Sequence, residues 1–504
     1  MFDLQGRKRK VRDHFSVCYG EPQRATILTN SAELNVWSPS PATDEPRRIH
    51  RRPLAYMRIV ANLASLMDAS STTTLRPSGW QGFPAGIFPF VGAIVSIAIT
   101  FSIGPERELK DLIQWFLHPI GMVILIQAGY TALLAVLWLR YKTFTAPDGA
   151  ELPTVSIVIP AFNEGPMVSR SIRSATQSDY PKDKLEIIVV DDGSRDDTYF
   201  HMRHLRKEFP DLVRLVRFIG NRGKRAALYE GFVAARGEIV LTIDSDSIIE
   251  PSTVREMVAP FLADAKVGAV AGRVAVLNRD SFISRMLEVQ YALAFDFGRA
   301  AQSAYRAVAC CPGALSAFRK AVILPHLEGW TQQRFLGKPV NHGEDQALTN
   351  IVLRAGYDTV YQSSAVIHTL APTQYGQLSR MFVRWDRSYI VEGFSFATFM
   401  FTRYRAHNRF LPILTFFVSS LRVIAVGYMI VGLPSLLSLS LDDVTRALVA
   451  LTLCTAFTAL YYLKIEKSFR FLYGVAYAVY AVLCLQWILP WALITVRDER
   501  WGTR

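Results

Sequence analysis

The alternation of apolar and polar positions changes along the chain and divides it into three kinds of segment. Between about residues 145 and 405, short β-branched runs alternate with amphipathic helical stretches, separated by turns rich in Gly and Asp. This order is typical of an α/β domain built on a parallel sheet. The pattern predicts strands over Thr154–Pro160, Leu185–Val190, Leu212–Phe218 and Glu238–Ile243, and helices over Met167–Gln177, Asp197–Phe209 and Arg225–Ala235.

Long apolar stretches flank this region on both sides. Two precede it, Phe83–Gly104 and Leu112–Leu139, and three follow, Leu411–Leu437, Ala447–Leu463 and Phe471–Val496. Each supplies roughly the 20 residues that cross the hydrocarbon core of a bilayer, although Arg422 inside the third makes that span less regular. Basic residues follow the second stretch, and the positive-inside bias then puts the N-terminus and the α/β region on the cytosolic side. The C-terminus would lie outside if all three later stretches cross.

We therefore expect four regions along the chain. Residues 1–82 form a basic, largely irregular cytosolic segment without a cleavable signal peptide, because nothing near Met1 has an apolar core. Two transmembrane helices occupy 83–142, a cytosolic domain with interfacial helices occupies 143–405, and about three transmembrane helices and a short tail occupy 406–504. The segment Ser281–Gln302 is predicted either as an amphipathic helix in the membrane plane or as a helix packed within the domain.

Composition narrows the class of protein. Half of the 504 residues are hydrophobic and only 20% are charged, against about 25% in soluble domains. A chain this apolar is not disordered, and five cysteines are too few for a disulfide scaffold. The net charge of +13 suits nucleic acid, an anionic membrane surface or a phosphorylated substrate. The basic residues lie in tails and beside the apolar stretches, and no recognition module is present, so we expect no nucleic-acid partner.

Acidic residues follow three of the predicted strands. Ala161 and Glu164 come after the first strand, Asp191 and Asp192 end the second, and Asp244-Ser245-Asp246 follows the fourth. Ligands of open parallel sheets bind where the carboxyl ends of the strands converge. Two carboxylates at alternate positions suit a hard divalent cation that holds phosphate oxygens, whereas taken alone each motif also fits an ordinary turn.

Further motifs lie downstream. The turn Gly220–Leu228 includes Lys224 at the start of a helix, an arrangement that suits a diphosphate but also an ordinary solvated loop. Cys310-Cys311-Pro312-Gly313 suits the wall of a sugar pocket, with packing as the favoured role of the two cysteines. Glu344 and Asp345 open a predicted helix and fit either a general base or a plain helix cap. Arg384-Trp385 fits sugar stacking beside phosphate, or a tryptophan at a membrane surface.

Taken in order, these motifs resemble the processive family-2 glycosyltransferases, which include hyaluronan, chitin or chitooligosaccharide, poly-N-acetylglucosamine and cellulose synthases. The resemblance runs from about Val155 to Ser388 and rests on five motifs in the family's order. It implies a GT-A fold, a Rossmann-like α/β domain with a mostly parallel sheet, embedded between transmembrane helices. It also implies a UDP-sugar donor, a growing glycan as acceptor, contact with membrane lipids, Mg²⁺ or Mn²⁺ as cofactor, and a multi-pass location in the plasma or inner membrane.

The resemblance further implies roles for single residues. Asp345 would be the catalytic base beside Glu344, and Asp246 would hold the metal. Trp385 would stack on the acceptor sugar, and Arg384 would lie near the diphosphate. The substrate-binding set is Ala161, Glu164, Asp191, Asp192, Lys224, Asp244, Arg384 and Trp385.

One position departs from the family's pattern. The family's last motif reads Gln-x-x-Arg-Trp, and this chain has Met381 where the glutamine stands. Methionine cannot make the hydrogen bonds of that amide, so they are absent or come from a neighbour such as Arg380. The substitution bears on processivity and product length more than on sugar transfer.

The sequence leaves three functions open. The first is an inverting polymerase that exports its chain, best matched to an N-acetylglucosamine-containing, hyaluronan- or chitin-like glycan. The second is a transferase that adds one sugar to a lipid carrier, and the third is a transporter with a regulatory domain.

Overall fold

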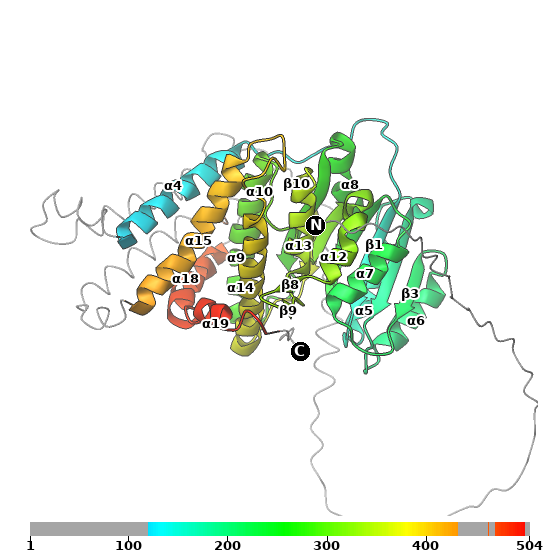
Figure 1. Cartoon of the computed structure of the whole chain (residues 1–504). Helices are drawn as coiled ribbons and strands as arrows, with labels where there is room; N and C mark the ends of the chain where they lie inside the picture. The colour runs from blue at the N-terminus through cyan, green and yellow to red at the C-terminus, as the bar shows by residue number, and fades with distance from the viewer. Residues whose placement is uncertain (1–118, 432–461, 463–468, 499–504) are drawn as a thin grey trace, which may run out of the picture. The chain divides into compact units, whose positions relative to one another are not determined.

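A computed structural model describes residues 119–431, Tyr462 and residues 469–498 (Figure 1). These residues belong to one compact unit, Gly79–Arg504. The expected N-terminal region 1–82 and the expected helices over Phe83–Gly104 and Ala447–Leu463 lie outside the described residues, apart from Tyr462.

An eight-stranded sheet forms the centre of the α/β domain, in the order β3-β2-β1-β4-β7-β6-β10-β5. The strands β3, β2, β1 and β4 are mutually parallel, and so are β6 and β10. β7 runs antiparallel to β4 and β6, and β5 runs antiparallel to β10, which makes the sheet mixed although six strands share one direction. The strands are β1 Val155–Ala161, β2 Leu185–Asp191, β3 Val213–Arg217, β4 Ile239–Ile243, β5 Ser247–Ile249, β6 Val267–Val276, β7 Leu315–Arg319 and β10 Asp358–Thr369.

The sheet is buried on both faces, which explains the nearly continuous apolar runs of its central strands. Successive side chains of a strand point to opposite faces. Ile157 therefore packs in one cluster with Ile172 of α5, whereas Val158 packs in the other with Phe232 of α7. The helices that follow the strands are α5 Met167–Thr176, α6 Thr198–Glu208, α7 Lys224–Ala234, α8 Thr253–Ala263, α11 Lys320–Ile323, α12 Leu327–Thr331 and α13 Glu344–Arg354. A two-stranded hairpin, β8 Arg334–Phe335 with β9 Lys338–Pro339, precedes α13.

The segment predicted as one helix over Ser281–Gln302 folds as three joined pieces. α9 spans Phe282–Tyr291, a π-helical turn spans Ala292–Phe297, and α10 spans Gly298–Ala304. α9 packs against β6 and α10 packs against β10. α10 also contacts α4 (Pro119–Leu139), and α9 contacts α18 (Leu472–Cys484), so the segment lies between the sheet and the apolar helices and both of its predictions stand.

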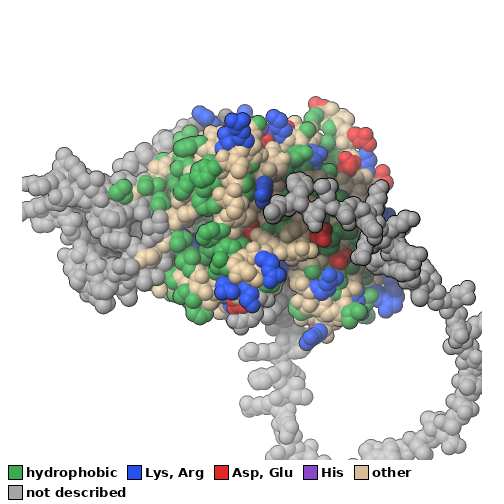
Figure 2. All heavy atoms as spheres, viewed as in Figure 1, with side chains coloured by type: hydrophobic (Ala, Val, Ile, Leu, Met, Phe, Trp, Pro, Cys, Tyr) green, Lys and Arg blue, Asp and Glu red, His purple; other side chains and the backbone are tan. Residues whose placement is uncertain are grey.

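Apolar helices lie beside the domain at the end away from β3 (Figure 1). α4 Pro119–Leu139 contacts α10 and α15 Phe410–Val431, and α14 Tyr375–Ala397 contacts α13 and α19. None of the described helices is by itself long and apolar enough to cross a membrane; the bent pair of α18 and α19 together meets that test of length and composition. Large apolar side chains are exposed on these helices (Figure 2), among them Phe394, Phe410, Phe417, Leu483 and Ile494.

The apolar stretch predicted over Phe471–Val496 forms two helices joined by a bend. The chain forms α18 Leu472–Cys484 and α19 Ile488–Ile494, which meet at a bend of 50°. Both ends of the pair are tied to the α/β domain, since Arg470 lies 3.4 Å from Glu288 of α9 and Arg387 of α14 donates to Thr495 at 2.8 Å.

Candidate active site

Three predicted site segments meet because their strands are neighbours in the sheet. β2, β1 and β4 lie side by side and run in the same direction, so their carboxyl ends share one edge. Ala161 at the end of β1 is paired with Asp191 at the end of β2. Asp244 follows β4 directly, which places the acidic motifs of the three strands at the same edge.

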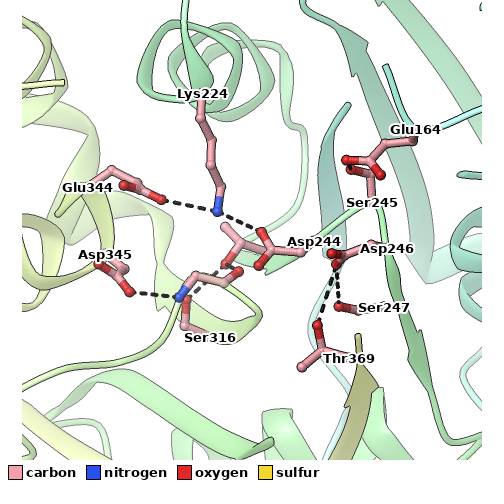
Figure 3. Close-up of polar contacts among 12 residues, drawn as sticks. Glu164, Lys224, Asp244, Ser245, Asp246, Ser247, Ser316, Glu344, Asp345 and Thr369 are labelled. Atoms are coloured by element: carbon pink, nitrogen blue, oxygen red, sulfur yellow. Dashed lines mark hydrogen bonds and ion pairs between the residues drawn. The ribbon is translucent and has the colours of Figure 1, made fainter. Parts of the chain in front are cut away.

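The Lys224 ammonium connects this edge to the start of α13 (Figure 3). Its Nζ lies 2.6 Å from Oδ1 of Asp244 and 3.1 Å from Oε1 of Glu344. Burial alone would lower the pKa of Lys224, but the two carboxylates outweigh it and hold the pKa above its ordinary value. Burial alone would likewise raise the pKa of Glu344, and the charges of Lys224 and Arg384 bring it below its ordinary value. A fixed positive charge thus lies between two anions.

Asp345 lies beside this pair and is held by backbone donors. One carboxylate oxygen accepts from the Gly313 amide at 3.0 Å, and the other accepts from the Gln346 amide at 2.8 Å. The Cys310 thiol donates to the same carboxylate at 3.7 Å. Burial and the nearby negative charge of Glu344 raise the pKa of Asp345 above its ordinary value. Two adjacent acids with pKa values moved in opposite directions are the pattern of an acid–base site.

Gly313 determines how closely these groups approach. A Cβ on Gly313 would lie 3.0 Å from Lys224 Nζ and 3.5 Å from Oε1 of Glu344. We expect Gly313→Ala to displace the ammonium by a few tenths of an ångström and to reduce kcat/KM about tenfold, because a small misplacement of a group in the site lowers the rate. UDP release measured against donor concentration checks this expectation.

Gly329→Ala is the matched control for that substitution. A Cβ on Gly329, in α12, meets nothing within 4 Å, so this variant should keep the wild-type rate. Equal rates for Gly313→Ala and Gly329→Ala would show that the close approach at Gly313 has no bearing on turnover.

Asp192 shapes the loop that leads to Lys224. Its carboxylate accepts from the backbone amides of Arg222 at 2.7 Å and Gly223 at 2.9 Å, and from the Asn221 side chain at 3.0 Å. Burial raises the pKa of Asp192 above its ordinary value, and the loop amides offset part of that rise. The predicted substrate-binding carboxylate of Asp192 therefore holds the loop that precedes Lys224.

Asp191 is buried within the sheet edge. It accepts from the Ser194 amide at 2.9 Å and from Arg217 at 3.2 Å. Gly193 follows with a φ of 74°, and a Cβ there would lie 2.5 Å from the backbone of Gly220. The two loops approach each other this closely only because the position is glycine. These contacts make Asp191 part of the loop scaffold.

Glu164 and Asp246 lie on either side of Ser245. The Ser245 hydroxyl donates to Glu164 at 3.0 Å, which joins the first acidic motif to the third. Asp246 accepts from the Ser247 hydroxyl at 3.0 Å and from Thr369 at 3.4 Å (Figure 3). Glu164, Asp244 and Asp246 are thus brought to one side of the site, opposite Asp345.

The oxygen donors at this edge fit a hard divalent cation. Within the described residues, no group of three or more His, Cys, Asp and Glu side chains is arranged to hold a metal ion. Mg²⁺ and related ions usually take only one or two protein carboxylates and complete their shell with substrate phosphates and water. Asp246 and Asp244, which are separated by Ser245, supply that number.

α14 carries Arg384 and Trp385 into the same region. The charge of Arg384 lowers the pKa of the Glu344 carboxyl, after the larger effect of Lys224. The Trp385 ring is half-buried and packs against aromatic side chains, with centroids 5.7 Å from Phe295 and 6.2 Å from Tyr291. Both partners come from the segment around the π-helical turn, and sequence reasoning did not assign them to the site.

Met381 is buried at the place of the family's glutamine. Its sulfur accepts from the Tyr291 hydroxyl at 3.7 Å, so it serves as packing beside the aromatic cluster. Arg380, the residue considered as its replacement, is exposed on the neighbouring face of α14.

Comparison with known proteins identifies this arrangement. Residues 153–388 match the family described as "Glycosyltransferase like family 2". An N-acetylglucosaminyltransferase from Azorhizobium caulinodans is 32% identical over 359 residues, which cover 70% of this chain and 87% of that protein. A hyaluronan synthase from Streptococcus pyogenes serotype M1 is 30% identical over 361 residues, which cover 69% and 83%. A solved mannosyltransferase from Pyrobaculum calidifontis, in complex with GDP-Man and Mn²⁺, is 23% identical with a TM-score of 0.49 and covers 78% of this chain and 99% of its own.

The mixed sheet and its polar edge are therefore those of a glycosyltransferase. The chain belongs to glycosyltransferase family 2. The resemblance to hyaluronan synthases and N-acetylglucosamine transferases predicted from the motifs is confirmed.

Proposed function

We propose that this glycosyltransferase polymerises UDP-activated sugars, with N-acetylglucosamine among them, and exports the chain across a membrane. The observation that carries the proposal is the placement of the Lys224 ammonium between Asp244 and Glu344, with Asp345 beside them. The Lys224 ammonium can bind a diphosphate in place of one of its two carboxylate partners. The name of the N-acetylglucosaminyltransferase from Azorhizobium caulinodans favours N-acetylglucosamine as a donor sugar.

The reaction we propose is a single displacement that inverts the anomeric carbon. The acceptor hydroxyl forms the new glycosidic bond as the bond to the diphosphate breaks, and its proton passes to Asp345. The amides of Gly313 and Gln346 orient the Asp345 carboxylate, and its raised pKa makes it a stronger base than an ordinary aspartate. Lys224 neutralises charge on the departing diphosphate.

Other residues would bind the two substrates. Ala161, Glu164 and Asp192 lie at the strand edge where the uridine would bind, and Arg384 would assist Lys224 at the diphosphate. Trp385 would stack on the acceptor sugar, with its ring braced by Phe295 and Tyr291. Mg²⁺ or Mn²⁺, held by Asp246 with Asp244, would supply further positive charge at the diphosphate.

We further propose that the apolar helices embed the enzyme in the plasma or inner membrane, with the catalytic domain on the cytosolic side. The four regions 1–82, 83–142, 143–405 and 406–504 are retained in this proposal. Exposed Phe410 and Phe417 on α15 and Leu483 on α18 support it, since soluble surfaces seldom expose such side chains together. The ties of Arg470 and Thr495 to α9 and α14 favour α18 and α19 as a pair that returns to the catalytic side.

One observation favours a second function, the transfer of a single sugar to a lipid carrier. Met381 places a buried thioether where the family has an amide, and its contact is with Tyr291. An acceptor chain would therefore lose that amide's hydrogen bonds, which weakens its retention after each transfer.

Product size distinguishes the two functions. The detergent-purified protein is supplied with single UDP-sugars and with pairs of them, together with Mg²⁺ or Mn²⁺, and UDP release and product length are measured. We expect UDP release with UDP-N-acetylglucosamine and a product of many sugars. A lipid that carries one sugar would overturn polymerisation, and release of UDP from no UDP-sugar would overturn the proposed donor.

A further inference from the structure

A chain of buried polar side chains joins the helices that carry the site residues. Arg225, the residue after Lys224, is 5% exposed, and its guanidinium donates to Oε1 of Gln333 and to the carbonyl of Trp330, both at 2.8 Å. It also donates to the carbonyl of His342 at 3.1 Å. Arg225 is therefore bound to the segment that leads into Glu344.

The chain continues from Gln333 to α14 and α13. The Gln333 amide donates to one oxygen of Glu392 at 2.7 Å, and the Asn350 amide donates to the other at 3.0 Å. Glu392 is 1% exposed and Asn350 is 6% exposed. We refer to Arg225, Gln333, Glu392 and Asn350 as the relay.

Each end of the relay is attached to a residue of the proposed machinery. Arg225 is in α7 beside Lys224, and Asn350 is in α13, the helix that begins with Glu344 and Asp345. Glu392 lies two turns after Trp385 in α14. The Trp330 indole, under the Arg225 guanidinium, donates to the carbonyl of Glu344 at 3.2 Å. The relay thus spans the three helices whose relative positions determine the distances in the site.

The energetics favour a positioning role over simple stabilisation. A buried charge pair often contributes little to stability compared with apolar side chains of the same size, because both charges lose their hydration. Hydrogen bonds of fixed geometry between elements do, however, select one arrangement of those elements. In catalysis, an error of about 1 Å in the placement of reacting groups costs on the order of a hundredfold in rate.

We infer that Gln333 and Glu392 are positioning residues. They hold the Glu344–Asp345 turn against Lys224, and they fix the position of the turn and of Lys224 relative to α14. The inference rests on the proposed function, in which Asp345 takes the proton of the acceptor. Neither residue touches substrate in this role, because each acts through Arg225 and Asn350.

The test compares two adjacent glutamines in the full-length, detergent-purified protein. Gln333→Ala removes both relay bonds, whereas Gln332→Ala, the control, alters an exposed side chain. We expect Gln333→Ala to lower kcat ten- to a hundredfold. The KM for the UDP-sugar should stay within about twofold, because the donor loop keeps its contacts with Asp192. Glu392→Gln should have a similar effect, and the double variant should lose little more than either single variant, since both break one connection.

A second measurement does not depend on turnover. Hydrogen exchange of the backbone amides of 342–348 should be faster in Gln333→Ala than in wild type, and unchanged in Gln332→Ala. If the wild type transfers no sugar from any UDP donor, the proposed function fails, and hydrogen exchange still decides the relay. If Gln333→Ala fails to fold, the same measurements are made on Gln333→Met, which keeps the volume of the side chain. Wild-type kcat together with wild-type exchange in either variant would overturn the inference, as would a rise in KM with kcat unchanged.

Discussion

Asp345→Asn should reduce sugar transfer by about two to four orders of magnitude, the usual contribution of a positioned general base. Asparagine has nearly the same shape and can still accept a hydrogen bond from Gly313 or Gln346, so donor binding should change little. UDP release at saturating donor measures the loss, and binding of UDP measured separately shows that the donor site remains.

The pH dependence gives the same prediction a second readout. Burial and Glu344 raise the pKa of Asp345, and only the deprotonated carboxylate can take a proton. Wild-type activity should therefore fall as the pH drops through a value above about 4, the ordinary pKa of aspartate. The residual activity of Asp345→Asn should not show this fall at acid pH. Asp211→Asn, at an exposed position, is the control. Near-wild-type activity in Asp345→Asn would exclude Asp345 as the base.

Lys224→Met should abolish measurable transfer and also destabilise the fold by about 3 kcal/mol, because it leaves the buried Glu344 and its neighbour Asp244 without their shared cation. Methionine keeps most of the volume of lysine, so the loss would come from charge and not from a cavity. Transfer is measured by UDP release, and stability by thermal unfolding at several pH values.

The sign of the pH effect follows from Glu344. In the wild type its pKa is below the ordinary value, so the ion pair stabilises the fold above the unfolded-state pKa, near 4.3, and this contribution is lost as the pH falls through the folded pKa. Without Lys224, burial raises the pKa of Glu344, and stability is lost as the pH rises through that value. The difference in unfolding free energy should therefore grow from pH 5 to pH 8. Lys207→Met, at an exposed position of α6, should behave as wild type; a constant difference would contradict the assigned ion pair.

The first half of the domain could be predicted from the sequence because its signals are local. Strands β1 to β4 and helices α5 to α7 lie within two residues of their predicted ends, since each apolar run is bounded by turn residues. β10 was not predicted, because buried polar side chains such as Gln362 interrupt its apolar pattern. The Gln362 amide donates to the carbonyl of Phe144 and to the carboxylate of Glu256.

Some residues of the candidate site could be predicted from the sequence, and others could not. Lys224, Asp244 and Glu344 are recognisable as charged residues at element ends, and the structure brings them together. The effect of Gly313 on the Lys224 ammonium depends on a distance across the fold, and so does the bond between Gln333 and Glu392. No spacing along the chain encodes these contacts, which join residues far apart in the sequence.

α14 connects Trp385 to two of the apolar helices. Immediately after Trp385, the side chain of Asp386 is bound to Arg422 of α15, and that of Arg387 is bound to Thr495 beyond α19. A movement of α15 or α19 would therefore reach Trp385 within one helical turn. Glu392 of the same helix connects it further, through Gln333, to Arg225 beside Lys224. In the membrane-embedded enzyme proposed above, the thickness of the bilayer and the choice of detergent would then change the positions of Trp385 and Lys224 together.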